Sequence, residues 1–195
     1  MKLMLDLYSG LGGASEAFVH DSDWSVLRYD NNPELRNVPL TTICDLKNYE
    51  IKCRHQIDLI WASPPCQDFS NAYDAPKPRA LRAGEDFEPD MSHLERAIEI
   101  IEELKPMWWV IENVAGAIKD FKPYLGEPRQ IIGPYVLWGN FPLLTFFQDQ
   151  RWKKEFNQTN SRTPLRSNIH AKIPLELSEG LLTALESQTT INEWS

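Results

Sequence analysis

The fold is decided by residues 3–13, which read Leu-Met-Leu-Asp-Leu-Tyr-Ser-Gly-Leu-Gly-Gly. The apolar run at 3–8 predicts a short buried strand, and the glycines after it predict a tight turn whose backbone can approach a ligand closely. Residues 14–19 then predict the beginning of a helix. In open α/β sheets, ligands bind beyond the carboxyl ends of the strands, so this turn is a candidate binding site.

The rest of the chain alternates between strand and helix patterns. Apolar runs of strand length occur at residues 24–29, 57–62 and 107–111. Apolar residues at helical spacing predict helices at 92–105 and 175–185. This alternation favours an α/β fold with a Rossmann-like, mostly parallel sheet whose two faces are covered by helices.

Three local patterns add detail. Ser92 and Glu95 have the spacing of a capping box at the beginning of a helix. Residues 135–138 and 143–147 predict a hairpin. Residues 71–90 hold four prolines and glycines and predict a long loop, which in a compact domain is usually functional or disordered.

Composition excludes several classes of protein. With 195 residues and 42% hydrophobic content, the chain fits one globular domain. It has no apolar run of about 18 residues that could span a membrane, and Asp6 interrupts the apolar N-terminus too early for a secretion signal. Cys44, Cys53 and Cys66 form no C-x-x-C pair, which favours a reducing compartment over a disulfide framework or a closed zinc site. We therefore predict a cytoplasmic protein without a metal, from a bacterium or, if virus-encoded, in the host cytoplasm.

Charge is distributed unevenly along the chain. The net charge of −8 argues against a protein that coats nucleic acid non-specifically. Residues 151–172, however, contain six basic residues and one acidic residue. This basic segment is either a local phosphate contact surface or a solvated loop.

Acidic residues end the two segments that follow the glycine turn. Asp30 lies at the end of the second strand, where a carboxylate can accept hydrogen bonds from two ribose hydroxyls. Asp45 ends the next short segment and could accept from an adenine amino group. A dinucleotide site would need a third glycine where Ser15 stands, so the pattern favours a nucleotide-like ligand without a pyrophosphate over a plain strand–helix turn.

Residues 63–70, Ser-Pro-Pro-Cys-Gln-Asp-Phe-Ser, carry the most chemical information. Two prolines stiffen the backbone and place Cys66 just beyond a buried strand, where a thiol with a lowered pKa can act as a nucleophile. The alternative is a small buried apolar side chain. Glu112 follows the run at 107–111, and a carboxylate there is costly unless it is paired or functional.

Three motifs together resemble a known family. Residues 8–13, 64–70 and 112–114 are similar to the first, fourth and sixth motifs of the DNA (cytosine-5)-methyltransferases, in the same order. The resemblance covers about residues 1–147 and implies a class I S-adenosylmethionine-dependent methyltransferase fold. It predicts a catalytic domain at 1–147, a basic segment at 148–172 in place of a target-recognition domain, and a C-terminal helix at 173–195 that packs back on the catalytic domain.

The resemblance implies a covalent mechanism. Cys66 would add as a thiolate to carbon 6 of cytosine while Glu112 holds N3 protonated, so that carbon 5 can take a methyl group from S-adenosylmethionine and leave S-adenosylhomocysteine. A stacked base cannot be reached, so the cytosine must be flipped out of double-stranded DNA.

The same resemblance assigns the binding residues. Those predicted to hold the cofactor are Tyr8, Ser9, Gly10, Leu11, Gly12, Gly13, Asp30, Asn31, Asp45, Leu46 and Pro64. Those predicted to contact the DNA and its flipped base are Pro65, Gln67, Ser70, Asn113, Arg79, Arg82, Arg162 and Arg166.

The chain departs from the family in two places. A family motif of the form Gln-x-Arg-x-Arg is reduced here to Arg129, which leaves the contact to cytosine O2 unassigned, with Arg162 and Arg166 as candidates. Only residues 148–168 stand where a large recognition region is usual, and 171–174 resemble the last motif without its Gly-Asn. We therefore expect sequence recognition to be short, relaxed or supplied by a partner subunit.

Alternatives remain open from the sequence. A tRNA cytosine-5 methyltransferase has the same motifs. A binding homologue without turnover, acting as a subunit of a complex, would keep the fold but would need neither Cys66 nor Glu112. The transferred group could also be a modified one, and restriction protection, regulation and anti-restriction are not distinguished.

Overall fold

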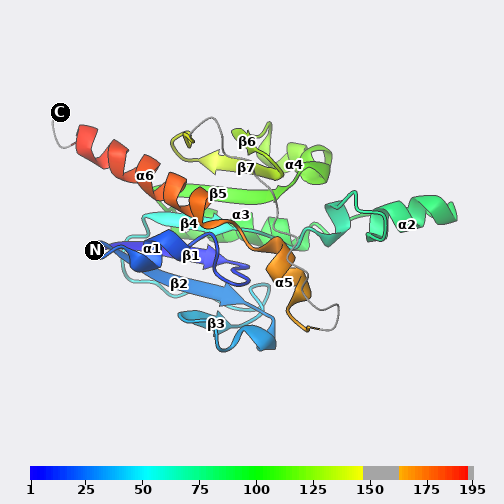
Figure 1. Ribbon diagram of the computed structural model, residues 1–195, viewed down its shortest axis with the longest axis horizontal. Coiled ribbons are helices and arrows are strands. Elements are labelled where there is room, and N and C mark those ends of the chain that lie inside the picture. The colour runs from blue at the N-terminus through cyan, green and yellow to red at the C-terminus, as the bar shows by residue number, and fades with distance from the viewer. Residues whose placement is uncertain (147–162, 193–195) are drawn as a thin grey trace.

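A seven-stranded mixed sheet forms the centre of the computed structural model, which describes residues 1–146 and 163–192 (Figure 1). Its strands, in spatial order, are β3 (Thr41–Ile43), β2 (Trp24–Asp30), β1 (Lys2–Leu7), β4 (Leu59–Ala62), β5 (Trp108–Val114), β7 (Tyr135–Asn140) and β6 (Gln130–Ile132). The first five strands in this order are parallel, and β7 is antiparallel to both β5 and β6. The central strands read as continuous apolar runs because both of their faces are buried.

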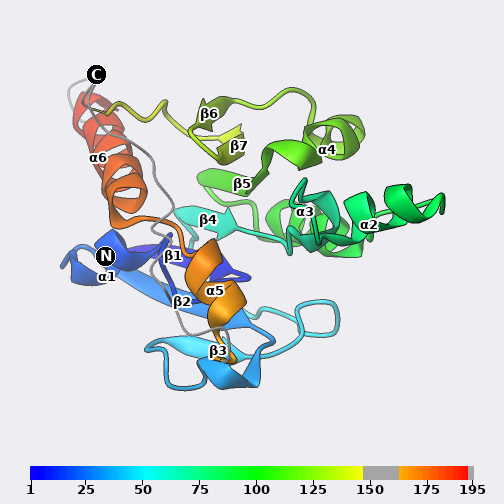
Figure 2. The same cartoon turned by 45° about the vertical axis from the view of Figure 1, so that its right-hand side comes forward.

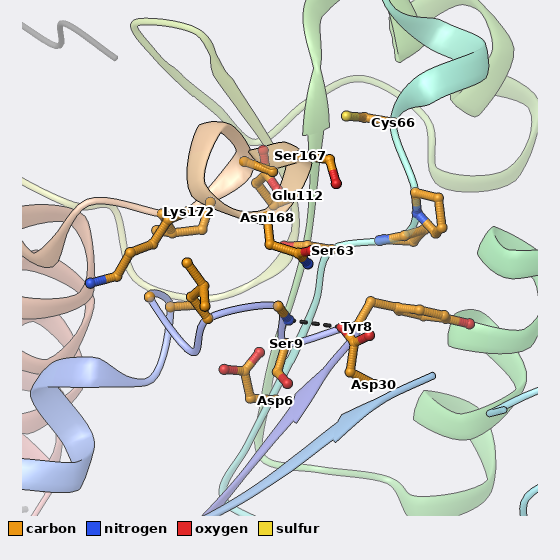
Figure 3. A pocket seen from close by; sticks show the side chains of 18 of the residues that line it. Asp6, Tyr8, Ser9, Asp30, Ser63, Cys66, Glu112, Ser167, Asn168 and Lys172 are labelled. Atoms are coloured by element: carbon orange, nitrogen blue, oxygen red, sulfur yellow. Dashed lines mark hydrogen bonds between the residues drawn. The ribbon is translucent and has the colours of Figure 1, made fainter. Parts of the chain in front are cut away.

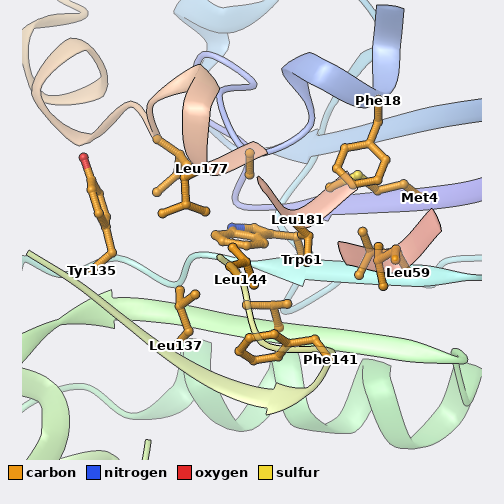
Figure 4. Close-up of a cluster of buried hydrophobic side chains, with 14 of the residues drawn as sticks. Met4, Phe18, Leu59, Trp61, Tyr135, Leu137, Phe141, Leu144, Leu177 and Leu181 are labelled. Atoms are coloured by element: carbon orange, nitrogen blue, oxygen red, sulfur yellow. The ribbon is translucent and has the colours of Figure 1, made fainter. Parts of the chain in front are cut away.

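Helices cover both faces of the sheet, as predicted (Figure 2). On one face lie α1 (Glu16–His20) and α6 (Leu175–Asn192), whose side chains join a core around Trp61 that includes Phe18 and Leu177 (Figure 4). On the other face lie α3 (Ser92–Leu104) and α4 (Ile118–Leu125), which pack on a second core around Ile60.

The remaining helical elements lie near the carboxyl ends of the strands. They are α2 (Pro76–Ala83), α5 (Arg166–Ala171) and three short 3-10 turns at Pro33–Leu35, Gln67–Phe69 and Ala115–Ala117. Figure 1 shows α2 extending away from the sheet.

The predicted hairpin between 135–138 and 143–147 is wrong. β7 pairs instead with β6, and Gly133, at a φ of 56°, makes the tight connection between them. Residues 141–146 lie outside any strand. The Gln130 side chain holds this segment, because it donates to the Leu144 carbonyl at 2.8 Å and accepts from the Leu144 N–H at 2.9 Å.

The segment 71–90 is not the unbroken loop that its prolines predicted. Pro76 begins α2, because the first turn of a helix needs no N–H donor and favours the φ of proline. Gly84 ends the helix at a φ of 71°, and its N–H bonds back to Ala80 and Leu81.

Two further boundaries differ from the predictions. The capping box is absent: Ser92 is itself the first residue of α3, and its N–H donates to the Asp90 carboxylate at 2.9 Å. Strand β5 continues to Val114 because β7 pairs along its whole edge, so Glu112 lies within the strand and not after it.

Candidate active site

A cavity of about 310 Å³ opens where β1, β2, β4 and β5 end, the edge that the glycine turn predicted (Figure 3). Many of the predicted site residues line it: Tyr8, Ser9, Gly10, Leu11, Gly13, Asp30, Asn31, Pro64, Pro65, Cys66, Gln67 and Glu112. Its size is in the range of small-molecule sites. The structure therefore brings the thiol, the carboxylate and the glycine turn to one place.

Cys66 is held by the segment that joins β4 to the 3-10 turn at Gln67–Phe69. The Trp61 indole donates to the Ser63 hydroxyl at 2.8 Å, and the buried Asn113 side chain donates to the Pro64 carbonyl at 3.0 Å. These two bonds fix the proline segment to β4 and β5. The thiol is half-buried, which leaves it reachable from the cavity.

Glu112 reaches the same cavity from β5. The residue is only 8% exposed, and its backbone pairs with Leu137 of β7. A carboxylate in such a place is costly to bury unless it is paired or hydrogen-bonded. Figure 3 shows it together with Cys66 at the end of the cavity opposite Asp6 and Asp30.

The glycine turn is fixed by hydrogen bonds to β2. Tyr8 has a φ of 58°, which is costly for a residue with a side chain and is typical of functional sites. The Gly10 N–H donates to the Asp30 carboxylate at 2.9 Å, and the other oxygen of Asp30 accepts from the Asn32 N–H at 2.9 Å. Asp30 therefore shapes the turn as well as lining the cavity.

A buried polar network explains why Ser15 stands at the position of the third glycine. The Ser15 hydroxyl donates to Asp6 at 2.5 Å and accepts from the Arg28 Nε at 2.8 Å. A second Arg28 nitrogen donates to the Gly12 carbonyl at 3.0 Å. Burial raises the pKa of Asp6 to about 7, an effect that the Ser15 hydrogen bond and the Arg28 charge oppose. A Cβ on Gly12 would lie 2.3 Å from the guanidinium carbon, so this glycine makes room for the network.

Two buried polar atoms in residues that line the cavity could hydrogen-bond to a polar ligand. Among the described residues, Ser9 Oγ and His93 Nδ1 have no hydrogen-bond partner, and both residues line the cavity. The rings of Tyr8 and His93 meet edge to face at 5.5 Å, and the Tyr8 hydroxyl donates to the His93 carbonyl at 3.1 Å. This end of the cavity suits a flat ring that carries hydrogen-bonding groups.

Several lining residues were missed by the sequence reasoning. They are Asp6, Ala14, Asn32, Ser63, His93, Val114, Tyr135, Ser167, Asn168, Ala171, Lys172 and Ile173. The last five come from α5 and the turn after it, and the Asn32 side chain donates to Asn168 at 3.1 Å. A Cβ on Gly13 would lie 2.2 Å from the Ile173 carbonyl oxygen, so the two segments pack backbone to backbone. The faint motif at 171–174 was the signal that could have placed them.

Other predicted residues do not line the cavity. Gly12, Asp45, Leu46, Ser70, Asn113, Arg79, Arg82 and Arg166 are absent from its wall, and Arg162 lies outside the described residues. The Asp45 carboxylate accepts from the Lys47 N–H at 3.0 Å and from the Asn48 side chain at 2.9 Å.

The predicted arginines that the structure describes lie on two helices, α2 and α5. Arg79 and Arg82 are on α2, where the Arg82 guanidinium lies 3.8 Å from the centre of the Tyr73 ring. Arg166 is the first residue of α5 and is exposed.

No cluster of three or more His, Cys, Asp or Glu side chains in 1–146 and 163–192 is placed to hold a metal ion. No helix in that part of the chain has the length and apolar character needed to cross a membrane.

Comparison with known proteins gives one family. Residues 3–125 match the model of C-5 cytosine-specific DNA methylases. The chain is 30% identical over 145 residues to a Frog virus 3 (isolate Goorha) protein described as "Probable DNA (cytosine-5)-methyltransferase". That match covers 70% of this chain and 65% of the relative's length.

Solved structures give more distant likenesses. One is a candidate DNA modification methyltransferase encoded within an E. coli prophage, with 20% identity and a TM-score of 0.46, covering 72% of this chain and 47% of that one. Another is the Entamoeba histolytica methyltransferase EhMeth, with 15% identity and a TM-score of 0.44, covering 77% and 55%.

Proposed function

The chain belongs to the C-5 cytosine-specific DNA methylase family, and from this premise we propose that it transfers a methyl group from S-adenosylmethionine to carbon 5 of a cytosine in DNA. It has the class I methyltransferase fold that its motifs predicted. The observation that carries the proposal is that Cys66 and Glu112, from different strands, line one cavity with the glycine turn and Asp30.

Cys66 and Glu112 divide the chemistry between them. The Cys66 thiolate forms a bond from Sγ to carbon 6 of cytosine, while Glu112 gives a proton to N3, so that the ring takes up the electron density displaced by the addition. Carbon 5 becomes nucleophilic and takes the methyl group. Loss of the carbon-5 proton to solvent then returns the electron pair that breaks the bond to Cys66, and N3 gives its proton back to Glu112 as the ring is restored.

The cofactor fits the opposite end of the cavity. S-adenosylmethionine supplies an electrophilic methyl group when bound. Tyr8 and His93 offer a place for the adenine, Asp30 offers a carboxylate for the ribose hydroxyls, and the glycine turn runs beside the space proposed for the methionine part. The unpartnered Ser9 Oγ and His93 Nδ1 are available for hydrogen bonds to it.

DNA is the proposed polymer because both the family model and the Frog virus 3 relative are described as acting on it. Cys66 lies inside a cavity, so the cytosine would have to leave the stack to reach it. Arg79 and Arg82 of α2, the helix that follows the Cys66 segment in the chain, are proposed to contact the phosphates. We also propose that sequence recognition relies on a partner subunit or on the segment 148–172.

Trapping with a fluorinated substrate tests this function. We propose to incubate the protein and S-adenosylmethionine with mixed-sequence double-stranded DNA in which every cytosine is 5-fluorocytosine, so that the target sequence need not be known. Fluorine cannot leave carbon 5 as a proton does, so the enzyme should remain bound through Cys66 as a complex that survives denaturation. A matched RNA, a tRNA transcript containing 5-fluorocytosine, runs in parallel.

The outcomes are distinct. An adduct on DNA that requires the methyl donor supports the proposal. An adduct on tRNA alone would move the activity to RNA, and cofactor binding without an adduct on either polymer would indicate a non-catalytic homologue.

Replacing Asp30 with alanine should weaken the binding of S-adenosylhomocysteine by about 1–3 kcal/mol, the cost of a lost charged hydrogen bond. The loss has two sources, because Asp30 is proposed to hold the ribose and also orders the Gly10 backbone. Calorimetric titration measures it directly. Asp23→Ala, an exposed aspartate outside the cavity, is the matched control, and equal affinities for the two variants would remove Asp30 from the site.

A further inference from the structure

The polar residues at the beginning of β6 are occupied away from the cavity. The Arg129 Nε donates to the Phe141 carbonyl at 2.6 Å, and its guanidinium lies 5.6 Å from the centre of the Phe141 ring. Gln130 is held by Leu144 through two hydrogen bonds. Neither residue lines the cavity. The reduced arginine motif therefore has no side chain here that could bind cytosine O2.

Tyr135 lies near Glu112, where a side chain that binds cytosine O2 is needed. It is the first residue of β7, and its backbone pairs with Val114, two positions from the pair that Leu137 makes with Glu112. Residues two apart on a strand share a face, so Tyr135 and Glu112 are diagonal neighbours on one face, a separation that a long aromatic side chain can bridge. Both residues line the cavity that contains Cys66.

The ring of Tyr135 is packed in the core, and its hydroxyl points away from that core. The residue is 5% exposed and joins the core that contains Leu137 and Leu177. Figure 4 shows the ring rising from β7 with the hydroxyl pointing away from that core. Packing on both sides leaves the ring few orientations, which is what a positioning group requires.

The hydroxyl keeps its proton at working pH. Burial, followed by the carboxylates of Glu112 and Glu176, raises the pKa of Tyr135 to about 12. A protonated phenol is a hydrogen-bond donor. The influence of Glu112 also agrees with the strand register, because it requires the two side chains to be close.

We propose that Tyr135 binds the flipped cytosine by donating a hydrogen bond from its hydroxyl to O2, and thereby places the adjacent N3 against Glu112. N3 and C2 are neighbours in the cytosine ring, so a donor beside the Glu112 carboxylate meets O2 when the carboxylate meets N3. This assignment rests on the proposed function and gives the O2 contact a candidate other than Arg162 and Arg166.

Combining a Tyr135 variant with a cytosine modified at O2 tests the assignment. Tyr135→Phe keeps the packed ring and removes only the hydroxyl. With cytosine DNA, it should lower kcat by about 10- to 100-fold without changing the KM for S-adenosylmethionine. With 2-thiocytosine, whose sulfur is a weak acceptor, wild type should lose a similar factor, and Tyr135→Phe should lose little more. Tyr124→Phe, which removes an exposed hydroxyl bonded to Glu95, is the matched control.

Each result decides between hypotheses. Transfer by Tyr135→Phe at the wild-type rate would overturn the assignment while leaving the proposed function intact. If 2-thiocytosine lowers kcat of Tyr135→Phe by the same factor as it lowers kcat of wild type, the two changes act independently. That result would show that the hydroxyl acts on something other than O2. If wild type itself forms no adduct with fluorinated DNA, the proposed function fails, and this assignment fails with it.

Discussion

Replacing Cys66 with alanine should abolish methyl transfer, lowering the rate by roughly 10³-fold or more, because the proposed mechanism needs the Cys66 thiolate to form the bond to carbon 6. Binding of S-adenosylhomocysteine should stay within a few-fold of wild type, since the cofactor residues Tyr8 and Asp30 are untouched. Transfer of labelled methyl groups to DNA measures the first effect, and calorimetry measures the second.

Cys53→Ala provides the matched control for Cys66→Ala. Cys53 is also a free, half-buried cysteine, but it lies outside the cavity, and its thiol contacts the His55 carbonyl. Its loss should leave transfer and adduct formation unchanged. Cys66→Ser adds a second test, because a hydroxyl keeps the shape of the thiol but is a much weaker nucleophile. Transfer by either Cys66 variant near the wild-type rate would exclude covalent catalysis by this residue.

Replacing Glu112 with glutamine should lower kcat by about 10²- to 10⁴-fold, the usual contribution of a positioned acid or base. Glutamine has the same shape, but it cannot transfer a proton to N3, so the addition of Cys66 is no longer assisted. Single-turnover kinetics with excess enzyme measure the chemical step directly. Adduct formation with fluorinated DNA should slow by a similar factor.

Stability separates a catalytic role of Glu112 from a structural one. Glu112 is 8% exposed, and glutamine fills the same volume and keeps groups that can hydrogen-bond. We therefore expect the urea midpoint of Glu112→Gln to stay close to that of wild type. Glu102→Gln, on the exposed side of α3, should change neither rate nor midpoint. A large drop in the midpoint of Glu112→Gln, in proportion to its loss of activity, would mean that the residue serves the fold.

The cavity depends on two parts of the chain that lie far apart in sequence. The glycine turn follows β1, whereas Asn168 and Lys172 come from α5 and the turn after it. Lys172 pairs with Glu16 at 2.7 Å, and the Ser178 hydroxyl donates to the Ala14 carbonyl at 2.7 Å. These contacts join the turn after α5 and the beginning of α6 to residues 14–16, at the beginning of α1. The segment that lines the cavity is therefore held by contacts to the rest of the fold.

The sheet and the reactive groups could be predicted from the sequence. The mainly apolar runs at residues 3–8, 24–29 and 57–62 became β1, β2 and β4, because buried parallel strands need no polar face. The glycine turn, Cys66 and Asp30 each follow one of these strands directly. Since parallel strands end at one edge of the sheet, local order along the chain was enough to predict that these groups would meet.

Which side chains complete the cavity depends on the tertiary structure. The antiparallel β7 lies between β5 and β6, and this register puts Tyr135 beside Glu112. Arg129, all that remains of the arginine motif, donates to the Phe141 carbonyl and does not line the cavity. Periodicity reports which face of an element is buried, but not which distant element covers it. Pairing between strands and the packing of α5 on the glycine turn depend on contacts far apart in sequence, and these exist only once the chain has folded.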